Sequence, residues 1–158
     1  SDLIASKLRL MSNLRFSVNG ESNSTTQFVA KARHFKLVVD EPEELGGADE
    51  AANPVEYILA GLAGCINVVG HLVAKELGFV ISKLNIDISG EINPDKLLGI
   101  SNHERAGFQS IQINLNPETE ADIVTLSQWL KIVEDRCPVK DNLRNETPVR
   151  LSVEKVYS

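Results

Sequence analysis

The stretch from Asn53 to Gly78 constrains the fold more than any other part of the sequence. It opens with Asn-Pro-Val-Glu, where the asparagine can accept from a first-turn amide and Glu56 can reach back to complete a capping box. It ends at a glycine, a residue that commonly terminates helices. Between these ends, apolar residues recur at intervals of four and three: Ile58, Leu62, Cys65, Val69 and Leu72. The sequence therefore predicts one long helix with a cysteine in the middle of its buried face.

The segments on both sides of this helix have the two-residue period of β-strands. Residues from about Leu8 to Asp40 predict three strands. The first alternates at Leu14, Phe16 and Val18 and is followed by a hairpin turn at Asn19-Gly20, which the polar segment from Glu21 to Thr26 widens. After the helix, two strands are expected at about 84–92 and 111–115, each with one polar, solvent-exposed face. A closing strand is expected where apolar residues alternate once more, at Val149, Leu151 and Val153.

A second amphipathic helix is expected between Asn116-Pro117, which repeats the cap pattern of the first helix, and Cys137. It should stop there because Pro138 disfavours helical geometry in the residue before it. Residues 138–143 predict a short third helix. The apolar stripe of the second helix consists of Ile123, Leu126, Leu130 and Val133.

These elements give the order three strands, a long helix, two strands, two helices and a strand. That order is an α+β pattern with mostly antiparallel sheet. A chain of 158 residues with this pattern predicts a single domain over residues 1–158. The central helix is apolar around much of its circumference, so we expect a second subunit to complete the core.

Charge and apolar patterning exclude several classes of function. The net charge of −6 argues against nucleic acid or an anionic lipid surface as the main partner. The only long apolar run is interrupted by Asn67 and His71, so we expect no membrane span and no secretory segment before the first strand. A cytoplasmic location follows, in which two cysteines are more often catalytic or redox-active than structural. The cysteines and histidines show no metal-ligand spacing, so no metal is expected.

Each cysteine allows two interpretations. Cys65 fits a small apolar residue on a packed helix face, where burial would raise its thiol pKa and make it inert without a nearby cation. Cys137 fits a buried turn residue, but it also stands beside Arg136 at the start of a short helix, and both features favour a thiolate. As a pair they fit a dithiol, if folding brings their Cα atoms within about 7 Å.

Several motifs together resemble the OsmC/Ohr family, over a similarity that runs from about Leu14 to Tyr157. They are Asp40-Glu41-Pro42, Gly46-Gly47, Asn53-Pro54-Val55-Glu56, Leu62-Ala63-Gly64-Cys65 and Arg136-Cys137-Pro138-Val139. The resemblance implies an antioxidant stress-response enzyme, a thiol-dependent peroxidase of organic hydroperoxides built as an intertwined homodimer. It further implies that Cys65 attacks the peroxide and that Cys137 resolves the resulting sulfenic acid. A dithiol or lipoyl-type reductant would restore the thiols without a metal, flavin or haem cofactor.

The sequence departs from the family pattern at two places. In the family, an arginine held by a carboxylate keeps the buried thiolate ionised. The carboxylate position is Val55 here, and Glu56 follows one residue later, where the capping box is an equally good role. No arginine lies at the matching place between residues 20 and 27, so Arg33, or else Arg15, is the substitute. A second function therefore stays open: a non-catalytic protein that binds an apolar small molecule at the dimer interface.

Overall fold

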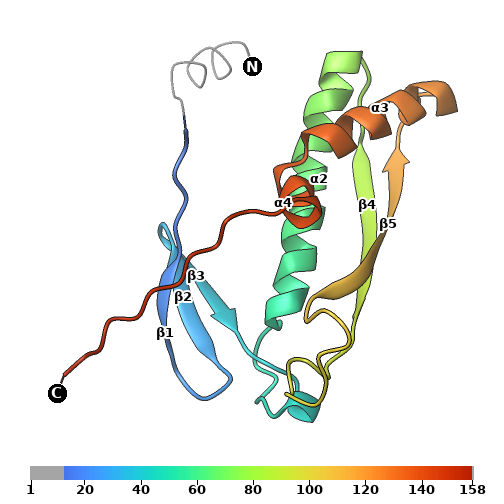
Figure 1. Cartoon of the computed structure of the whole chain (residues 1–158). Coiled ribbons are helices and arrows are strands. Elements are labelled where there is room, and N and C mark those ends of the chain that lie inside the picture. The colour runs from blue at the N-terminus through green and yellow to red at the C-terminus, as the bar shows by residue number, and fades with distance from the viewer. Residues whose placement is uncertain (1–12, 158) are drawn as a thin grey trace. The chain divides into compact units, whose positions relative to one another are not determined.

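The computed structural model describes residues 13–157, so the first residues of the predicted strand region, 8–12, lie outside the described residues. The chain divides into an N-terminal unit that ends at Tyr57 and a C-terminal unit that begins at Ile58, and the single domain stays a prediction. Figure 1 labels the α-helices and the strands. In chain order the elements are β1 (Asn19–Ser22), β2 (Phe28–Ala32), β3 (Phe35–Val39), the 3-10 helix η1 (Glu43–Leu45), α2 (Pro54–Leu77), β4 (Lys83–Ile92), β5 (Phe108–Glu118), α3 (Ile123–Arg136) and α4 (Pro138–Arg144).

The N-terminal unit contains a three-stranded antiparallel sheet in the order β1-β2-β3. The second and third predicted strands are thus confirmed. The first strand lies later than predicted, because residues 14–18 are not in a strand, and the turn overlaps the predicted polar segment and does not begin at Asn19-Gly20. Asn19 and Gly20 pair with β2 inside β1, and the chain reverses over residues 23–27 instead. There the Asn23 amide donates to the Gln27 carbonyl at 2.8 Å, and the Ser24 hydroxyl accepts from the Gln27 amide at 2.8 Å. These local bonds give the later residues a better turn than the Asn-Gly pair.

The carboxylate of Asp40, which is fully buried, connects the loops of this unit. Its oxygens accept from the Thr26 hydroxyl at 2.9 Å, the Glu41 amide at 2.8 Å, the Gln27 side chain at 3.4 Å and the Glu50 amide at 3.3 Å. These bonds, above all the one from the Glu41 amide, lower the pKa of Asp40, although burial opposes them.

We therefore expect Asp40→Asn to destabilise the protein at neutral pH, because an amide would turn its NH2 group toward some of these donors. The folded pKa is depressed, so the stabilisation is fully present above the unfolded value of about 3.8 and is lost as the pH falls through the lower folded value. Urea unfolding followed by circular dichroism at several pH values measures this. Asp49→Asn, an exposed change in the same loop, is the control. Equal acid dependence in wild type and Asp40→Asn would contradict the assignment.

Both predicted ends of the central helix are confirmed in α2. At its start, the Asn53 amide donates to Glu56 Oε1 and the Glu56 amide donates to Asn53 Oδ1, each at 2.9 Å, which is a complete capping box. At its end, Gly78 has a φ of 82°, and the amide after it donates to the Ala74 carbonyl at 3.0 Å.

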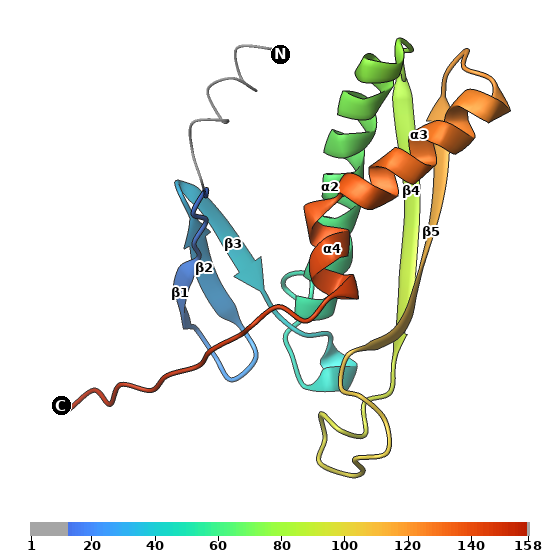
Figure 2. The same cartoon turned by 45° about the horizontal axis from the view of Figure 1, so that its top comes forward.

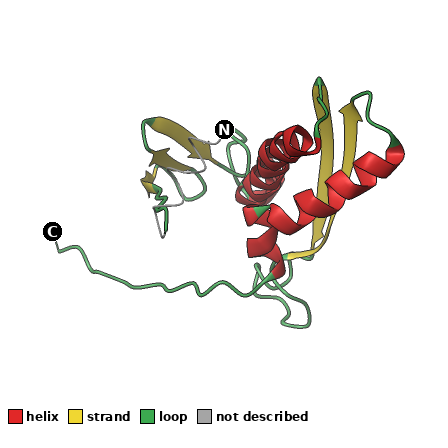
Figure 3. Ribbon diagram, turned by 90° about the horizontal axis from the view of Figure 1, so that it is seen from above, coloured by secondary structure: helices red, strands yellow, loops and turns green. Residues whose placement is uncertain are grey.

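The C-terminal unit packs α2 and α3 against the ribbon of β4 and β5, beside which both helices lie in Figure 3. In the antiparallel register, Ile86 lies opposite Leu115 on the apolar face, and Asp87 lies opposite Asn114 on the polar face. The two expected strands, each with one solvent-exposed face, are thus confirmed. The core consists of Leu62, Ile66, Val69, Val73, Ala74, Ile81, Trp129, Val133 and Cys137.

The predicted buried face of α2 is correct only in part. Leu62 and Val69 are buried, but Ile58 and Leu72 are 40% and 43% exposed. Ile66 is buried in place of the preceding residue, Cys65, which is only partly buried. Because α2 is apolar around most of its circumference, the period of its residues could not decide which face enters the core.

The second helix starts later than predicted. Asn116 and Pro117 pair with β4 inside β5, and the cap of α3 is Asp122, whose carboxylate accepts from the Thr125 amide at 2.8 Å. The end of α3 before Cys137 and the short helix α4 are confirmed. The buried residues of α3 are Trp129 and Val133. The expected stripe residues Ile123 and Leu130 are 75% and 41% exposed.

The closing strand is not formed in the described chain. Val149, Leu151 and Val153 lie outside any strand and are 78%, 89% and 94% exposed. A strand needs a neighbouring backbone to bond its amides and carbonyls, and this segment has none among residues 13–157.

The expectation about membrane spans needs a correction. By length and composition α2, with 24 residues, is long and apolar enough to cross a membrane despite Asn67 and His71. Its buried residues, however, form the core shared with α3 and the β4–β5 ribbon. Helix α2 therefore supplies a large part of the core of the C-terminal unit.

Candidate functional site

Cys137 joins two helices in the core of the C-terminal unit. It is at once the residue that ends α3 and the residue that caps α4, and its backbone is extended, with φ −78° and ψ 110°. The extended backbone follows from Pro138, which disfavours the helical region for the residue before it. The side chain is 1% exposed, so this thiol lies in the interior of the unit.

The structure brings Cys65 together with Cys137. Cys65 lies in the middle of α2 and packs against the core cluster that contains Cys137, and both thiols are free. Burial raises the pKa of the Cys65 thiol, a hydrogen bond from the Val139 backbone amide lowers it, and the Cys137 side chain raises it further. The expected Cα separation below about 7 Å stays a prediction.

The raised pKa of Cys65 means that this site favours a thiol over a thiolate at neutral pH. A cation near the sulfur would reverse that preference. Among the described residues, no lysine or arginine contributes to the shift of this pKa. Activation of Cys65 therefore needs a charge that the surroundings of the thiol in the C-terminal unit do not supply.

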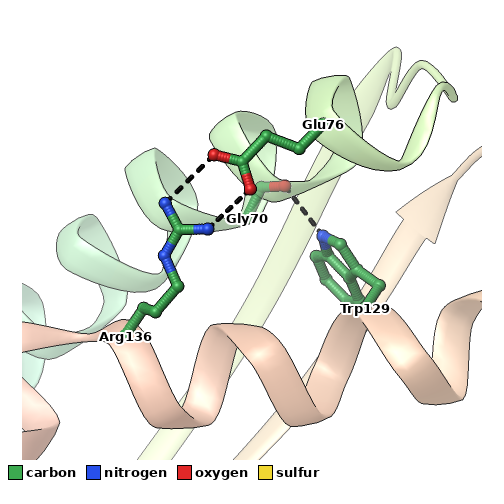
Figure 4. Close-up of polar contacts among 4 residues, drawn as sticks. All are labelled: Gly70, Glu76, Trp129 and Arg136. Atoms are coloured by element: carbon green, nitrogen blue, oxygen red, sulfur yellow. Dashed lines mark hydrogen bonds and ion pairs between the residues drawn. The ribbon is translucent and has the colours of Figure 1, made fainter. Parts of the chain in front are cut away.

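Arg136, the predicted cation beside Cys137, is bound to a carboxylate instead. Its Nη1 lies 2.6 Å from Glu76 Oε2 and its Nη2 lies 3.1 Å from Glu76 Oε1, which is a bidentate ion pair (Figure 4). The hydrogen bonds from Arg136 lower the pKa of Glu76. The pair joins the last turn of α3 to the last turn of α2.

A second contact between the same helices is buried. The indole Nε1–H of Trp129 donates to the Gly70 carbonyl oxygen at 2.7 Å (Figure 4). Gly70 favours this approach, because a Cβ there would lie 3.0 Å from the indole and 3.4 Å from the Leu84 side chain, a tighter contact than side chains usually make. Figure 2 shows α3 running across to α2, with α4 following where α3 ends. The two contacts together fix the helix that carries Cys137.

The remaining candidate residues belong to the N-terminal unit. Arg33 occupies the two-residue turn between β2 and β3 with a φ of 56°, and its guanidinium carbon lies 4.9 Å from the centroid of the Phe35 ring. Arg15 precedes β1 and is exposed. Glu56 is exposed and engaged in the capping box. Contact of either arginine or of Glu56 with Cys65, which lies in the other unit, stays a prediction.

An apolar cavity of about 370 Å³ opens between β5 and α3. Ile113, Leu126 and Leu130 are among its walls, and Cys137 and Lys140 also line it. Its volume and lining suit a small apolar molecule. Among residues 13–157 no group of three or more side chains is arranged to hold a metal ion.

Two residues of this site were not found from the sequence: Glu76 and Trp129. Glu76 could have been suspected, because it lies eleven residues after Cys65 and so returns to the same side of an α-helix after about three turns. Trp129 is the only tryptophan of the chain and precedes the buried Val133 by four residues. Its contact with Gly70 joins residues 59 positions apart, which no local pattern reveals.

Comparisons with known proteins agree with this architecture. The family model described as OsmC-like protein matches residues 46–152, more than half of the chain. An OsmC-like protein from Mycoplasma pneumoniae is similar in structure, with a TM-score of 0.73 and 18% identity, covering 84% of this chain and 89% of that chain.

Two organic hydroperoxide resistance proteins have the same fold. The protein from Elizabethkingia anophelis has a TM-score of 0.62 and 18% identity, over 85% of this chain and 91% of its own. The protein from Legionella pneumophila has a TM-score of 0.61 and 16% identity, over 84% of this chain and 91% of its own. No curated protein matches this sequence.

Proposed function

This chain belongs to the OsmC-like protein family, and we propose that it is a thiol-dependent peroxidase that reduces organic hydroperoxides. The observation that carries the proposal is the position of Cys65 against the core cluster that contains Cys137, with both thiols free. Two similar structures belong to organic hydroperoxide resistance proteins, which supports the same substrate class. A cytoplasmic, antioxidant role in stress response follows from this chemistry.

The proposed reaction uses the two sulfurs in order. The Cys65 thiolate attacks the terminal peroxide oxygen, the O–O bond breaks, and the alkoxide leaves as an alcohol after taking a proton. The Cys137 thiol then attacks the sulfenic acid of Cys65, so that an S–S bond forms and the hydroxyl leaves as water. A dithiol or lipoyl-type reductant donates two electrons and two protons to restore both thiols.

The first step requires an activating cation, because burial raises the pKa of Cys65. We assign this role to Arg33, with Arg15 as the alternative. Glu56 is the candidate carboxylate for holding the guanidinium, but its bonds with Asn53 favour the capping role. A guanidinium next to the sulfur stabilises the thiolate and can donate to the bound peroxide.

We further propose an obligate homodimer of OsmC-like domains, each formed by both units of the chain. Apolar side chains support this: Val68 and Leu72 on α2 are 66% and 43% exposed, and the alternating segment from Val149 to Val153 is exposed as well. The buried interface should exceed the standard size of roughly 1,600 Å². Sedimentation at micromolar concentration should show a dimer. A folded monomer under these conditions would contradict the assembly.

A second function is favoured by the apolar cavity and by the raised pKa of Cys65. Under this alternative the protein binds an apolar small molecule and carries out no reaction. It predicts two slowly reacting, independent thiols.

A peroxide-consumption assay tests the proposed function. Wild type and Cys65→Ser would be compared with cumene hydroperoxide and with hydrogen peroxide, each with dihydrolipoamide as reductant. We expect wild type to consume cumene hydroperoxide faster than hydrogen peroxide, and Cys65→Ser to lose both activities. Consumption by wild type no faster than by Cys65→Ser would overturn the proposal in favour of the binding function.

Glu56→Gln separates the two roles of this side chain. If Glu56 acts only as a cap, the substitution should be nearly neutral, because an amide oxygen also serves a capping box. The free energy of unfolding should then change by less than about 0.5 kcal/mol. We expect this result with the peroxidase rate preserved, since the structure shows the capping bonds. Parallel melting and rate measurements decide the matter. A strong loss of rate in a stable variant would instead assign Glu56 to the arginine.

A further inference from the structure

The Arg136–Glu76 ion pair joins the two helices that lead to the cysteine pair. Glu76 follows Cys65 by eleven residues on α2, a rotation that leaves the two about 20° apart around the helix axis and three turns apart along it. Arg136 is bonded in sequence to Cys137. The same side of α2 therefore carries Glu76, which binds Arg136, and Cys65, which packs against the core cluster that contains Cys137.

We propose that Arg136 and Glu76 are positioning residues that hold the thiol of Cys137 in reach of Cys65 for disulfide formation. The proposal rests on the redox role of the cysteines given above. Neither residue touches the reacting atoms in this assignment. The pair acts by restricting where the end of α3, and with it Cys137, can lie on α2.

The geometry of the pair suits this role better than a role in stability. The side chains are 38% and 48% exposed, and exposed ion pairs contribute little to folding. The two parallel N–H···O bonds nonetheless fix the orientation of both partners, as single-point contacts do not.

The end of α3 needs such a restraint. The last buried residue of α3 is Val133, three residues before Arg136, and helix ends open more easily than helix interiors. Cys137 already lies beyond the last helical residue, where the chain changes direction into α4. With the ion pair absent, the thiol would sample more positions and meet Cys65 less often.

The effect can be measured without any peroxide. In mixtures of reduced and oxidised dithiothreitol, the two thiols lose two electrons and two protons to the oxidised reagent and form the Cys65–Cys137 disulfide. The equilibrium constant reports the effective concentration of one thiol at the other. Alkylation and mass spectrometry of the full-length protein quantify both forms.

Five proteins make the test: wild type, Arg136→Met, Glu76→Gln, the exchange of both charges (Arg136→Glu with Glu76→Arg), and Lys131→Met. We expect each single change at the pair to lower the disulfide equilibrium constant about three- to fivefold, the size of a well-formed surface ion pair. The charge exchange should recover at least half of the loss. Lys131→Met, which removes an exposed cation from the same helix, should have no effect.

The outcomes separate positioning from structure and from the proposed function. Unchanged equilibrium constants in Arg136→Met and Glu76→Gln overturn the proposal, and so does an equal loss in Lys131→Met or no recovery in the charge exchange. Lower melting temperatures with unchanged constants would show a merely structural pair and also overturn it. Since no hydroperoxide is present, a chain that fails as a peroxidase can still pass this test, and a working peroxidase can fail it.

Discussion

Replacing Cys137 by serine should leave the first turnover with an organic hydroperoxide intact and should prevent sustained turnover. Cys65 would still attack the peroxide, but its sulfenic acid would have no neighbouring thiol to condense with. We expect steady-state peroxide reduction to fall at least about tenfold, because an intramolecular step is replaced by a slower bimolecular one. The trapped sulfenic acid should also be open to over-oxidation to the sulfinic acid.

Cys65→Ser is the matched comparison for this prediction, since it removes the other thiol of the same pair. It should abolish even the first turnover. Rapid mixing with one equivalent of peroxide, followed by a sulfenic acid trap and mass spectrometry, measures both variants. If Cys137→Ser loses the first turnover and Cys65→Ser keeps it, the roles of the two cysteines are reversed.

Trp129→Ala should be the most destabilising single substitution in the C-terminal unit. The indole is 2% exposed, donates to the Gly70 carbonyl and meets the Phe79 ring edge-on at a centroid distance of 6.5 Å. Removing it leaves a cavity in the core, and such changes cost about 3–5 kcal/mol. Chemical unfolding followed by circular dichroism at fixed protein concentration measures the loss.

Two further variants show which part of the tryptophan matters. Trp129→Phe keeps most of the volume but loses the N–H donor, so we expect it to cost about 1–2 kcal/mol. Leu130→Ala changes the neighbouring side chain, which is 41% exposed, and should cost less than half as much as Trp129→Ala. A Trp129→Ala protein as stable as Leu130→Ala would contradict the anchoring of α3 on α2.

The elements that local chemistry determines were predictable from the sequence. The capping box of Asn53 and Glu56 and the terminal Gly78 gave both ends of α2, and the alternation of apolar residues gave the β4–β5 ribbon. Where several faces or turns were equally possible, prediction failed. Helix α2 is apolar nearly all round, so its buried face depends on what packs against it. The turn after β1 depends on side-chain bonds of Asn23 and Ser24 that outweigh the Asn-Gly pair.

The site was predictable to the same extent. The packing of Cys65 against the core cluster that contains Cys137 was predictable, because two apolar helix faces must enter the same core. The roles of the two thiols stay predictions. Glu76 and Trp129 were missed, since their partners lie 60 and 59 positions away in the sequence and only the packing of α3 on α2 brings them together. The closing strand at Val149 to Val153 depends on a neighbouring strand, which a pattern within one segment cannot supply.

The reaction of the wild-type protein with one equivalent of cumene hydroperoxide tests the central claim most directly. Mass spectrometry of the folded protein, after alkylation of the remaining thiols, identifies the state of each cysteine. Our account predicts one intramolecular disulfide between Cys65 and Cys137, formed in proportion to the peroxide added. Two unmodified thiols in the folded protein would contradict it.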